Sequence, residues 1–241
     1  MPAEGHQDRG GSTRSRQVLA RVRSHVRPGS FSMLLGTGVV LYILNGAAID
    51  TPTGTSLSRL GHLAVLVASL YVVSYNRLLL LSGAVVCVLV LSFELRLWPA
   101  DTQGARAVED LLAMSFQAAV FVTMLREVFR SSTSEFDAVV GALGGFVLLL
   151  MLFMRLHGLL EAVTPGSYFA QGPPFSARSD AELDATFQYF STVTLTTVGF
   201  GDIVPVAPAA RLVTGLEAMI GQLYLAVVIA TLVGRVAARR D

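Results

Sequence analysis

The run from Thr196 to Asp202 reads Thr-Thr-Val-Gly-Phe-Gly-Asp and combines residues suited to binding a dehydrated cation with backbone oxygen atoms. Gly199 and Gly201 have no Cβ atom, so they can adopt backbone angles that keep successive carbonyl oxygens on one side of the chain. Oxygens placed in this way can replace the water shell of a potassium ion when several chains surround one axis. The run therefore predicts a site that binds K+ and passes it on.

The other residues of the run have separate expected roles. Thr197 can add a hydroxyl at the inner end, whereas Val198 and Phe200 should point away from the axis and wedge the strand against the preceding helix. Asp202 should lie at the outer mouth, where a carboxylate raises the local cation concentration. We expect K+ to bind at Thr197, Val198, Gly199 and Phe200, and Gly201 to complete the selectivity filter.

A short helix is expected directly before this run. Asp180-Ala-Glu-Leu-Asp184 offers an N-cap and an acidic first turn, and Ala185 to Val193 continues the helix for about three turns. The helix is too short to cross a bilayer, and the extended run after it would leave backbone groups unsatisfied in lipid. Both must therefore be enclosed by protein or line an aqueous cavity, which predicts a re-entrant pore loop.

The composition places this loop in a membrane protein. Of 241 residues, 53% are hydrophobic and only 15% are charged, whereas a soluble domain usually carries about 25% charged residues. Apolar segments that we expect to form transmembrane helices lie at roughly 31–49, 60–75, 78–97, 108–128, 137–158 and 210–235. The tight turn at Asn76-Arg77 predicts a hairpin of the second and third. The expected fold class is an all-α membrane protein with six transmembrane helices, and the pore helix and filter lie between the fifth and sixth.

The arginine distribution predicts the orientation. Cytoplasmic flanks of membrane spans accumulate Lys and Arg, and six arginines fall within residues 1–30. We therefore expect a multi-pass protein of the plasma membrane with both termini in the cytoplasm and the pore loop facing outward. The net charge of +1 gives no basis for binding nucleic acid.

The motifs resemble those of the potassium channel superfamily. The run Thr196–Asp202 is similar to its filter motif, with Phe200 where tyrosine is commoner, and Tyr189-Phe190-Ser191 resembles the aromatic pair and serine of its pore helix. The segment from Arg211 to Gly221 resembles the inner helix, with Gly221 as its hinge glycine. The resemblance to a bacterial two-helix pore covers about residues 137–237 well, and the preceding residues only by the number of spans.

The resemblance implies a homotetramer, because a ring of four carbonyl oxygens at each site needs four loops. It also implies that Tyr189, Phe190 and Ser191 support the filter from the pore helix. Glu217 is an ionisable residue inside a span, and we expect its carboxyl group to hydrogen-bond the pore helix and prop up the filter. Below the hinge, a helical stripe is expected either to line the cavity or to pack; it consists of Gln222, Leu225 and Ile229.

Other residues of the spans have simpler interpretations. Gly141, Gly144 and Gly145 form a small-residue face on the fifth span, which predicts close helix packing. His157 could sense external pH, although a lone histidine at a helix end is more commonly interfacial. Tyr168 is interpreted as an interfacial anchor, as is Trp98.

Three regions are expected along the chain: an Arg-rich cytoplasmic arm at 1–30, a four-helix voltage-sensor-like membrane domain at 31–130, and a pore domain at 131–241. The fourth span has no basic residue across its centre, and Arg126 and Arg130 lie at its cytoplasmic edge. Steep voltage dependence takes about three or four charges per subunit, each worth about 2.3 kcal/mol per 100 mV. We therefore expect little voltage gating.

The predicted function is passive, potassium-selective conduction, without enzyme activity and without a cofactor other than the permeant K+. A transporter subunit would carry fused, degenerate loops, and a non-selective channel would have an interrupted filter, so the single intact run disfavours both. A voltage-modulated potassium channel and a non-conducting regulatory subunit stay open as alternatives. The Arg-rich arm and residues 126–136 are candidates for contact with membrane lipid, including anionic lipid.

Overall fold

The computed structural model describes residues 30–47, 52–74, 76–94, 103–129 and 135–238, so the predicted arm, Trp98 and Arg130 lie outside the described residues. The chain is mostly helical, as expected. Its elements are α2 (Ser30–Ala47), α3 (Pro52–Val73), α4 (Arg77–Glu94), α5 (Gln103–Val128), α6 (Glu135–Val163), β1 (Tyr168–Ala170), the short 3-10 helix η1 (Phe175–Ala177), α7 (Asp180–Leu195), β2 (Ile203–Pro205) and α8 (Pro208–Ala238).

Three helical stretches among the described residues are long and apolar enough to cross a membrane: Asp110–Val128, Glu135–Val163 and Pro208–Gly234. The apolar parts of the earlier helices are shorter and cover Phe31–Gly46, Leu60–Val73 and Arg77–Ser92. The fourth, fifth and sixth predicted spans therefore have the required length and hydropathy, whereas the first three predicted spans are apolar but shorter.

The predicted hairpin of α3 and α4 is present. Asn76 directly precedes α4, and its side-chain Oδ1 accepts hydrogen bonds from the backbone N–H groups of Leu78 at 3.0 Å and Leu79 at 3.4 Å. These bonds satisfy donors that the first turn of a helix leaves without an intrahelical partner. The sequence Asn76-Arg77 therefore ends one helix and starts the next within a tight turn.

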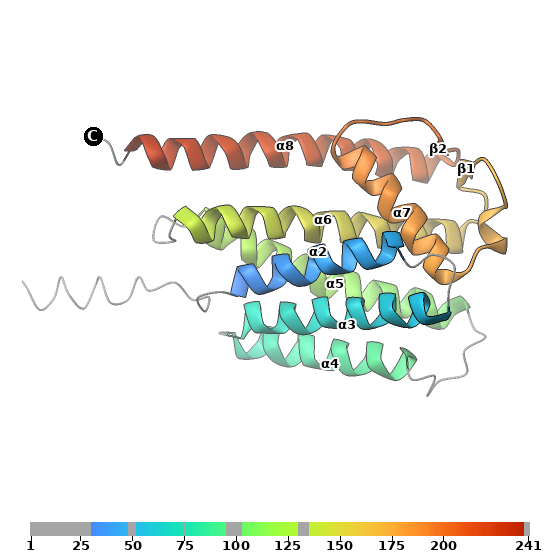
Figure 1. Ribbon diagram of the computed structural model, residues 1–241, viewed down its shortest axis with the longest axis horizontal. Helices are drawn as coiled ribbons and strands as arrows, with labels where there is room; N and C mark the ends of the chain where they lie inside the picture. Colours follow the sequence, from blue (N-terminus) through green and yellow to red (C-terminus); the bar gives the residue numbers. More distant parts are fainter. Residues whose placement is uncertain (1–29, 48–51, 75, 95–102, 130–134, 239–241) are drawn as a thin grey trace, which may run out of the picture.

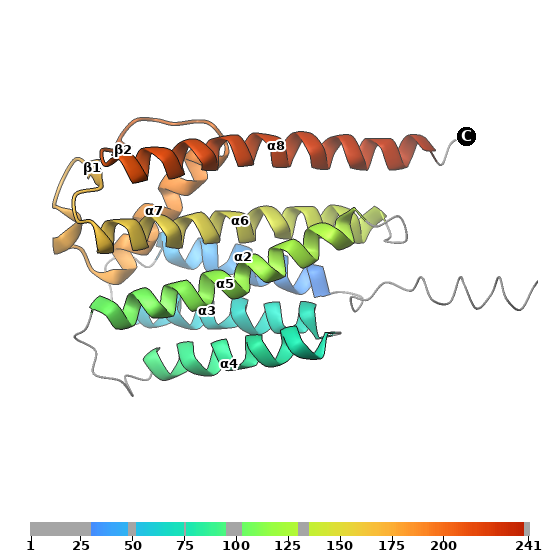
Figure 2. The same ribbon diagram turned by 180° about the vertical axis from the view of Figure 1, so that it is seen from behind.

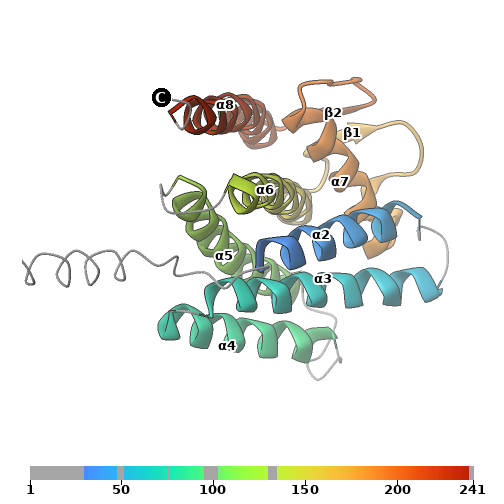
Figure 3. The same cartoon turned by 60° about the vertical axis from the view of Figure 1, so that its left-hand side comes forward.

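Helix α6 is the centre of the arrangement. It contacts α2, α5, α7 and α8. Figures 1 and 2 both show α8 on one side of α6 and the four earlier helices on the other, and Figure 3 shows α7 between α6 and the start of α8. The C-terminal end of α6, both strands and the start of α8 lie at one end of the molecule. The start of α6 and the end of α8 lie at the opposite end.

Small residues let α6 approach its neighbours closely. A Cβ atom at Gly141 would lie 2.9 Å from a methyl carbon of Val128, and one at Gly144 would lie 3.0 Å from Met124 Cε. At Gly145 it would lie 2.6 Å from Tyr224 Oη, and that hydroxyl donates a hydrogen bond to the Ala142 carbonyl at 2.5 Å. The predicted packing role of this glycine face is confirmed.

Replacing Gly145 with Ala should destabilise the protein, because the added methyl group meets a tyrosine that its own hydrogen bond holds in place. We expect the free energy of unfolding to fall by about 1–3 kcal/mol. Each 1 kcal/mol lowers the melting temperature by about 2–4 °C in a chain of this size. Circular dichroism in detergent measures the change. The matched control is Gly36→Ala on α2, where a Cβ atom meets nothing within 4 Å, so that its melting temperature should not fall. Equal melting temperatures for the two variants would contradict the packing argument.

Candidate functional site

Helix α7 begins with a capping box rather than with the predicted Asp180 cap. The Ser179 hydroxyl accepts a hydrogen bond from the Glu182 backbone N–H at 3.4 Å, and the Glu182 carboxylate accepts one from the Ser179 N–H at 2.5 Å. Two hydrogen bonds from Ser179 lower the pKa of the Glu182 carboxyl group: the bond from its backbone N–H has the larger effect, and the bond from its hydroxyl has the smaller one. The pattern Ser-x-x-Glu was the available sequence signal. The helix is also longer than the predicted three turns, since it runs from Asp180 to Leu195.

The end of α7 leads directly into the run Thr196–Asp202. The Val193 carbonyl accepts hydrogen bonds from the N–H groups of Val198 at 2.8 Å and Gly199 at 3.1 Å. These bonds turn the chain back on the last turn of the helix. After them, residues 198–200 have no regular secondary structure, as expected for an extended strand whose carbonyl groups are free to bind an ion.

Residues with a positive φ angle alternate along the run with residues that have a negative one. Thr197, Gly199 and Gly201 have positive φ angles of 58°, 52° and 78°, whereas Val198 and Phe200 between them do not. Alternation of this kind lets successive carbonyl groups face the same side of the chain, which a uniform helix or strand does not allow. Glycine adopts the left-handed conformation at little cost, but a β-branched threonine does so only when its surroundings hold it there.

A side chain from α8 contacts the strained Thr197. Gln222 Nε2 donates a hydrogen bond to Thr197 Oγ1 at 3.0 Å. The preceding residue, Gly221, lies against the backbone of Leu195 so closely that a Cβ atom would overlap its carbonyl oxygen. Helix α8 is continuous through Gly221, so the structure gives this glycine a packing reason, and the predicted hinge stays a prediction. Leu225 and Ile229 are exposed on the surface of α8, as is Gln222.

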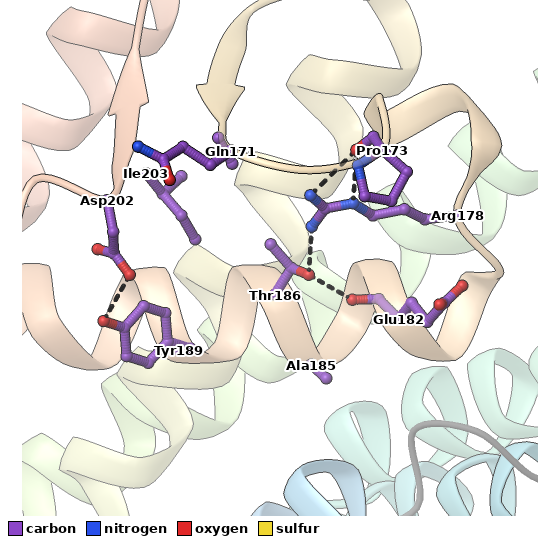
Figure 4. Close-up of a pocket in the computed structure, with 10 residues that line it drawn as sticks. Gln171, Pro173, Arg178, Glu182, Ala185, Thr186, Tyr189, Asp202 and Ile203 are labelled. Carbon is purple, nitrogen blue, oxygen red and sulfur yellow. Dashed lines mark hydrogen bonds between the residues drawn. The ribbon is translucent and has the colours of Figure 1, made fainter.

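The outer end of the run is tied to α7. Tyr189 donates a hydrogen bond through its hydroxyl to Asp202 Oδ2 at 2.8 Å, and this bond raises the pKa of Tyr189 (Figure 4). Val198 is 52% exposed and Phe200 is 70% exposed. Neither side chain is buried against α7 within one chain, so the expectation that both wedge the run against the preceding helix stays a prediction.

The segment between α6 and α7, residues 164–179, is called the turret here and contains strand β1 and the 3-10 helix η1. Strands β1 and β2 pair antiparallel, with Tyr168 opposite Pro205 and Ala170 opposite Ile203, and this pairing places the turret beside the outer end of the run. Figure 4 shows an open pocket between the turret and α7, into which Arg178 projects. The Arg178 guanidinium donates to Thr186 Oγ1 at 2.9 Å and to the Pro173 carbonyl.

A polar junction lies behind α7 and consists of His157, Tyr168, Glu217 and Ser191. His157 of α6 is within hydrogen-bond distance of Tyr168 Oη, at 2.5 Å from Nδ1, and of Glu217 Oε2, at 2.7 Å from Nε2. The Ser191 hydroxyl of α7 also faces the Glu217 carboxyl group, so Glu217 lies between α6 and the pore helix, and its expected role in supporting the filter stays a prediction. His157 and Tyr168 are 0% and 3% exposed, so the interfacial interpretation of both is wrong.

A second polar contact joins α7 to the first helix of the bundle. Asn45 Nδ2 donates to Gln188 Oε1 at 2.9 Å, and Gln188 Nε2 donates to the Tyr42 carbonyl at 3.0 Å. Both amides are buried. Sequence reasoning missed this pair, and the only signal for it was an amide side chain within an otherwise apolar segment.

Comparisons with known proteins converge on this part of the chain. Residues 184–238 match a family described as "Ion channel", a range that holds most of α7, the run and α8. The chain is 42% identical over 108 residues to the potassium voltage-gated channel protein shk-1 of Caenorhabditis elegans, which covers 44% of this chain and 17% of that protein. It is 33% identical over 104 residues to the voltage-gated potassium channel Kch of Escherichia coli (strain K12), which covers 43% of this chain and 22% of that protein. The similarity therefore spans less than a quarter of the length of either relative.

Replacing Ser179 with Ala should loosen the first turn of α7. The change removes a side-chain cap, and we expect hydrogen exchange at the amides of residues 181–183 to become about fivefold faster, as measured by mass spectrometry. The stabilisation from Glu182 requires its ionised form, because its pKa is lowered in the folded protein. The variant keeps the bond from the backbone N–H of residue 179 to the Glu182 carboxylate, so the protection of these amides should fall in both proteins as the pH falls through that lowered pKa.

The matched control for this measurement is Ser176→Ala, in the exposed segment just before the cap. It should leave exchange in α7 unchanged. Equal exchange in the Ser179→Ala protein and its parent at neutral pH would show that the cap does not hold the helix.

Proposed function

Because the chain is a member of the potassium channel superfamily, we propose that it is a subunit of a passive, potassium-selective channel in which four copies surround one pore. The observation that carries this proposal is the alternating backbone of residues 197–201 at the C-terminal end of α7. In this proposal, Thr197, Val198, Gly199, Phe200 and Gly201 form the selectivity filter, and Asp202 lies at its outer mouth.

The surroundings of the filter suit cation conduction. The negative end of the α7 dipole lies at Leu195, directly before the filter, and stabilises a cation on its inner side. Gln222 holds the inner end through Thr197, and Tyr189 holds the outer end through Asp202. Consecutive carbonyl groups between these fixed ends can replace the water shell of K+ without the protein having to reorganise at each step. On the other side of α7, Phe190 packs against His157 of α6 and Ser191 faces Glu217 of α8.

Four copies are proposed because one chain supplies one filter strand and leaves an apolar surface beside it. The exposed residues include Val198 and Phe200 of the filter and Leu212, Met219 and Leu223 of α8. Exposed apolar residues beside a strand of free carbonyl groups suit contact with further copies of the same chain. The filter and the stripe of Gln222, Leu225 and Ile229 would then face the pore axis.

We propose that all six long helices cross the plasma membrane and that α7 is a re-entrant pore helix. The turret, β2 and the start of α8 lie at one end of the molecule (Figure 1), which is the outer end in this proposal. Both termini would then be cytoplasmic. Residues 31–130 form a four-helix membrane domain beside the pore domain of residues 131–241. Membrane lipid, including anionic lipid at the basic arm, is the other proposed partner.

Purified protein in liposomes should pass K+ in preference to Na+, and barium should block the flux. Replacing Gly201 with Ala should lower K+ flux at least about tenfold, because a Cβ atom in the left-handed conformation costs about 1–2 kcal/mol and turns a carbonyl group away from the axis. The matched control is Gly172→Ala, which carries the same strain at φ +103° in the turret and should keep its flux. Equal K+ and Na+ flux would refute selectivity, and a folded tetramer without flux would favour a non-conducting subunit.

We also expect conduction to depend little on voltage, although both relatives are named as voltage-gated. Residues 111–125 of α5 contain no Arg, Lys or His, and Arg126 lies in its last turn. A charge at this position crosses little of the membrane field. In planar bilayers, the parent and Arg126→Gln proteins should therefore show nearly the same open fraction across voltage. Steep activation that is lost on neutralising Arg126 and Arg130 would sink this expectation.

A further inference from the structure

The polar junction behind the pore helix is formed by four elements. α6 supplies His157, β1 supplies Tyr168, α8 supplies Glu217, and the α7 residue Ser191 turns its hydroxyl toward the Glu217 carboxyl. His157 and Glu217 are both 0% exposed. The junction therefore joins the outer helix, the turret, the inner helix and the pore helix at one buried point.

Aromatic rings enclose the junction. His157 packs with ring-centroid distances of 5.0 Å to Phe190, 6.3 Å to Phe187 and 6.3 Å to Phe153. These rings offer no polar group that could compensate a charge. A net charge on the His157–Glu217 pair would thus have only two neutral hydroxyl groups, those of Tyr168 and Ser191, as close polar partners, and a buried charge without a counter-charge is strongly unfavourable.

This apolar enclosure favours the protonation states in which the His157–Glu217 pair has no net charge. Two arrangements leave the pair neutral: a protonated histidine beside an ionised carboxylate, and a neutral histidine beside a protonated carboxyl. In both of them the Nδ1–H group of His157 can donate to Tyr168 Oη. Removing or adding one proton leaves a single buried charge in either case.

The other titratable groups near the pair have partners of their own. On α6, the Glu161 carboxylate accepts hydrogen bonds from the Gly166 and Tyr168 N–H groups, and Arg155 pairs with Asp110 of α5 at 2.9 Å. On α8, Arg211 donates to the Pro205 carbonyl. Burial, together with the Glu217 and Glu161 carboxylates, raises the pKa of Tyr168, which therefore remains a neutral phenol. From α7, the groups at the junction are aromatic rings and the Ser191 hydroxyl.

We propose that His157 and Glu217 hold one proton between them as a net-neutral pair, and that both are positioning residues on which the alignment of α7, and therefore conduction, depends. This inference deepens the proposed function and rests on it for its conduction readout. A net-neutral pair makes the parent protein insensitive to pH at this site, because gaining or losing a proton would leave a lone buried charge. Removing either partner should therefore create a pH dependence that the parent lacks.

The test measures K+ flux in liposomes and the melting temperature in detergent from about pH 5.5 to about pH 8.5, a range that brackets the ordinary histidine pKa. His157→Gln leaves a lone carboxyl group, so flux and melting temperature should both fall as the pH rises. Above the carboxyl pKa of this variant, the neutral fraction falls about tenfold per pH unit. Glu217→Gln leaves a lone histidine, so both quantities should fall as the pH decreases.

The double variant His157→Gln, Glu217→Gln has no titratable group at the pair and should again give flat profiles. A simple loss of packing would instead lower flux and melting temperature in all three variants without a pH dependence in the single variants. Flat profiles in both single variants would overturn the proposal, and so would a parent profile with the same slope as the variants. If His157→Gln does not fold at any pH, the profile of the isosteric Glu217→Gln decides. If the parent folds but passes no K+, the proposed function fails, while the melting profiles still test the shared proton.

Discussion

The backbone of α8 lies directly against the backbone of α7 where Gly221 meets the Leu195 carbonyl, and the contacts around the filter depend on that close approach. Any side chain at position 221 would push the two helices apart. One residue later, Gln222 reaches Thr197, and one turn earlier, Glu217 reaches His157. A single glycine therefore sets the helix spacing that both the inner end of the filter and the polar junction require.

The proposed filter is held by side-chain hydrogen bonds at its two ends. Side chains of α7 and α8 hold Asp202 and Thr197, whereas the carbonyl groups between these residues are not consumed by regular secondary structure. This division is what ion binding requires, because a carbonyl that is used in a helix or a sheet is no longer available to replace water. The positive φ angle of Thr197 is strained, because the alternation of φ angles begins there at a residue other than glycine.

The sequence was sufficient to predict the helical segments, the hairpin at Asn76 and the unusual backbone at Gly199 and Gly201, because these features depend on local residue types and spacing. The predicted N-cap of α7 was wrong by one residue. Ser179 and Asp180 can both cap a helix, and Ser179 is the cap because it forms a capping box with Glu182. The contact of Glu217 with His157 and the partners of Gln188 could not be predicted. They lie on other helices, and which side chains meet there depends on how the helices pack.

The hydrogen bonds from the end of α2 to Gln188 join the four-helix bundle to the pore helix of the same chain. In the proposed ring of four copies, these bonds would attach each bundle to the quarter of the filter that its own chain supplies. A defect in one α2 would then loosen one quarter of the ring. In mixed assemblies, damage from such a defect would grow in steps with the number of altered subunits.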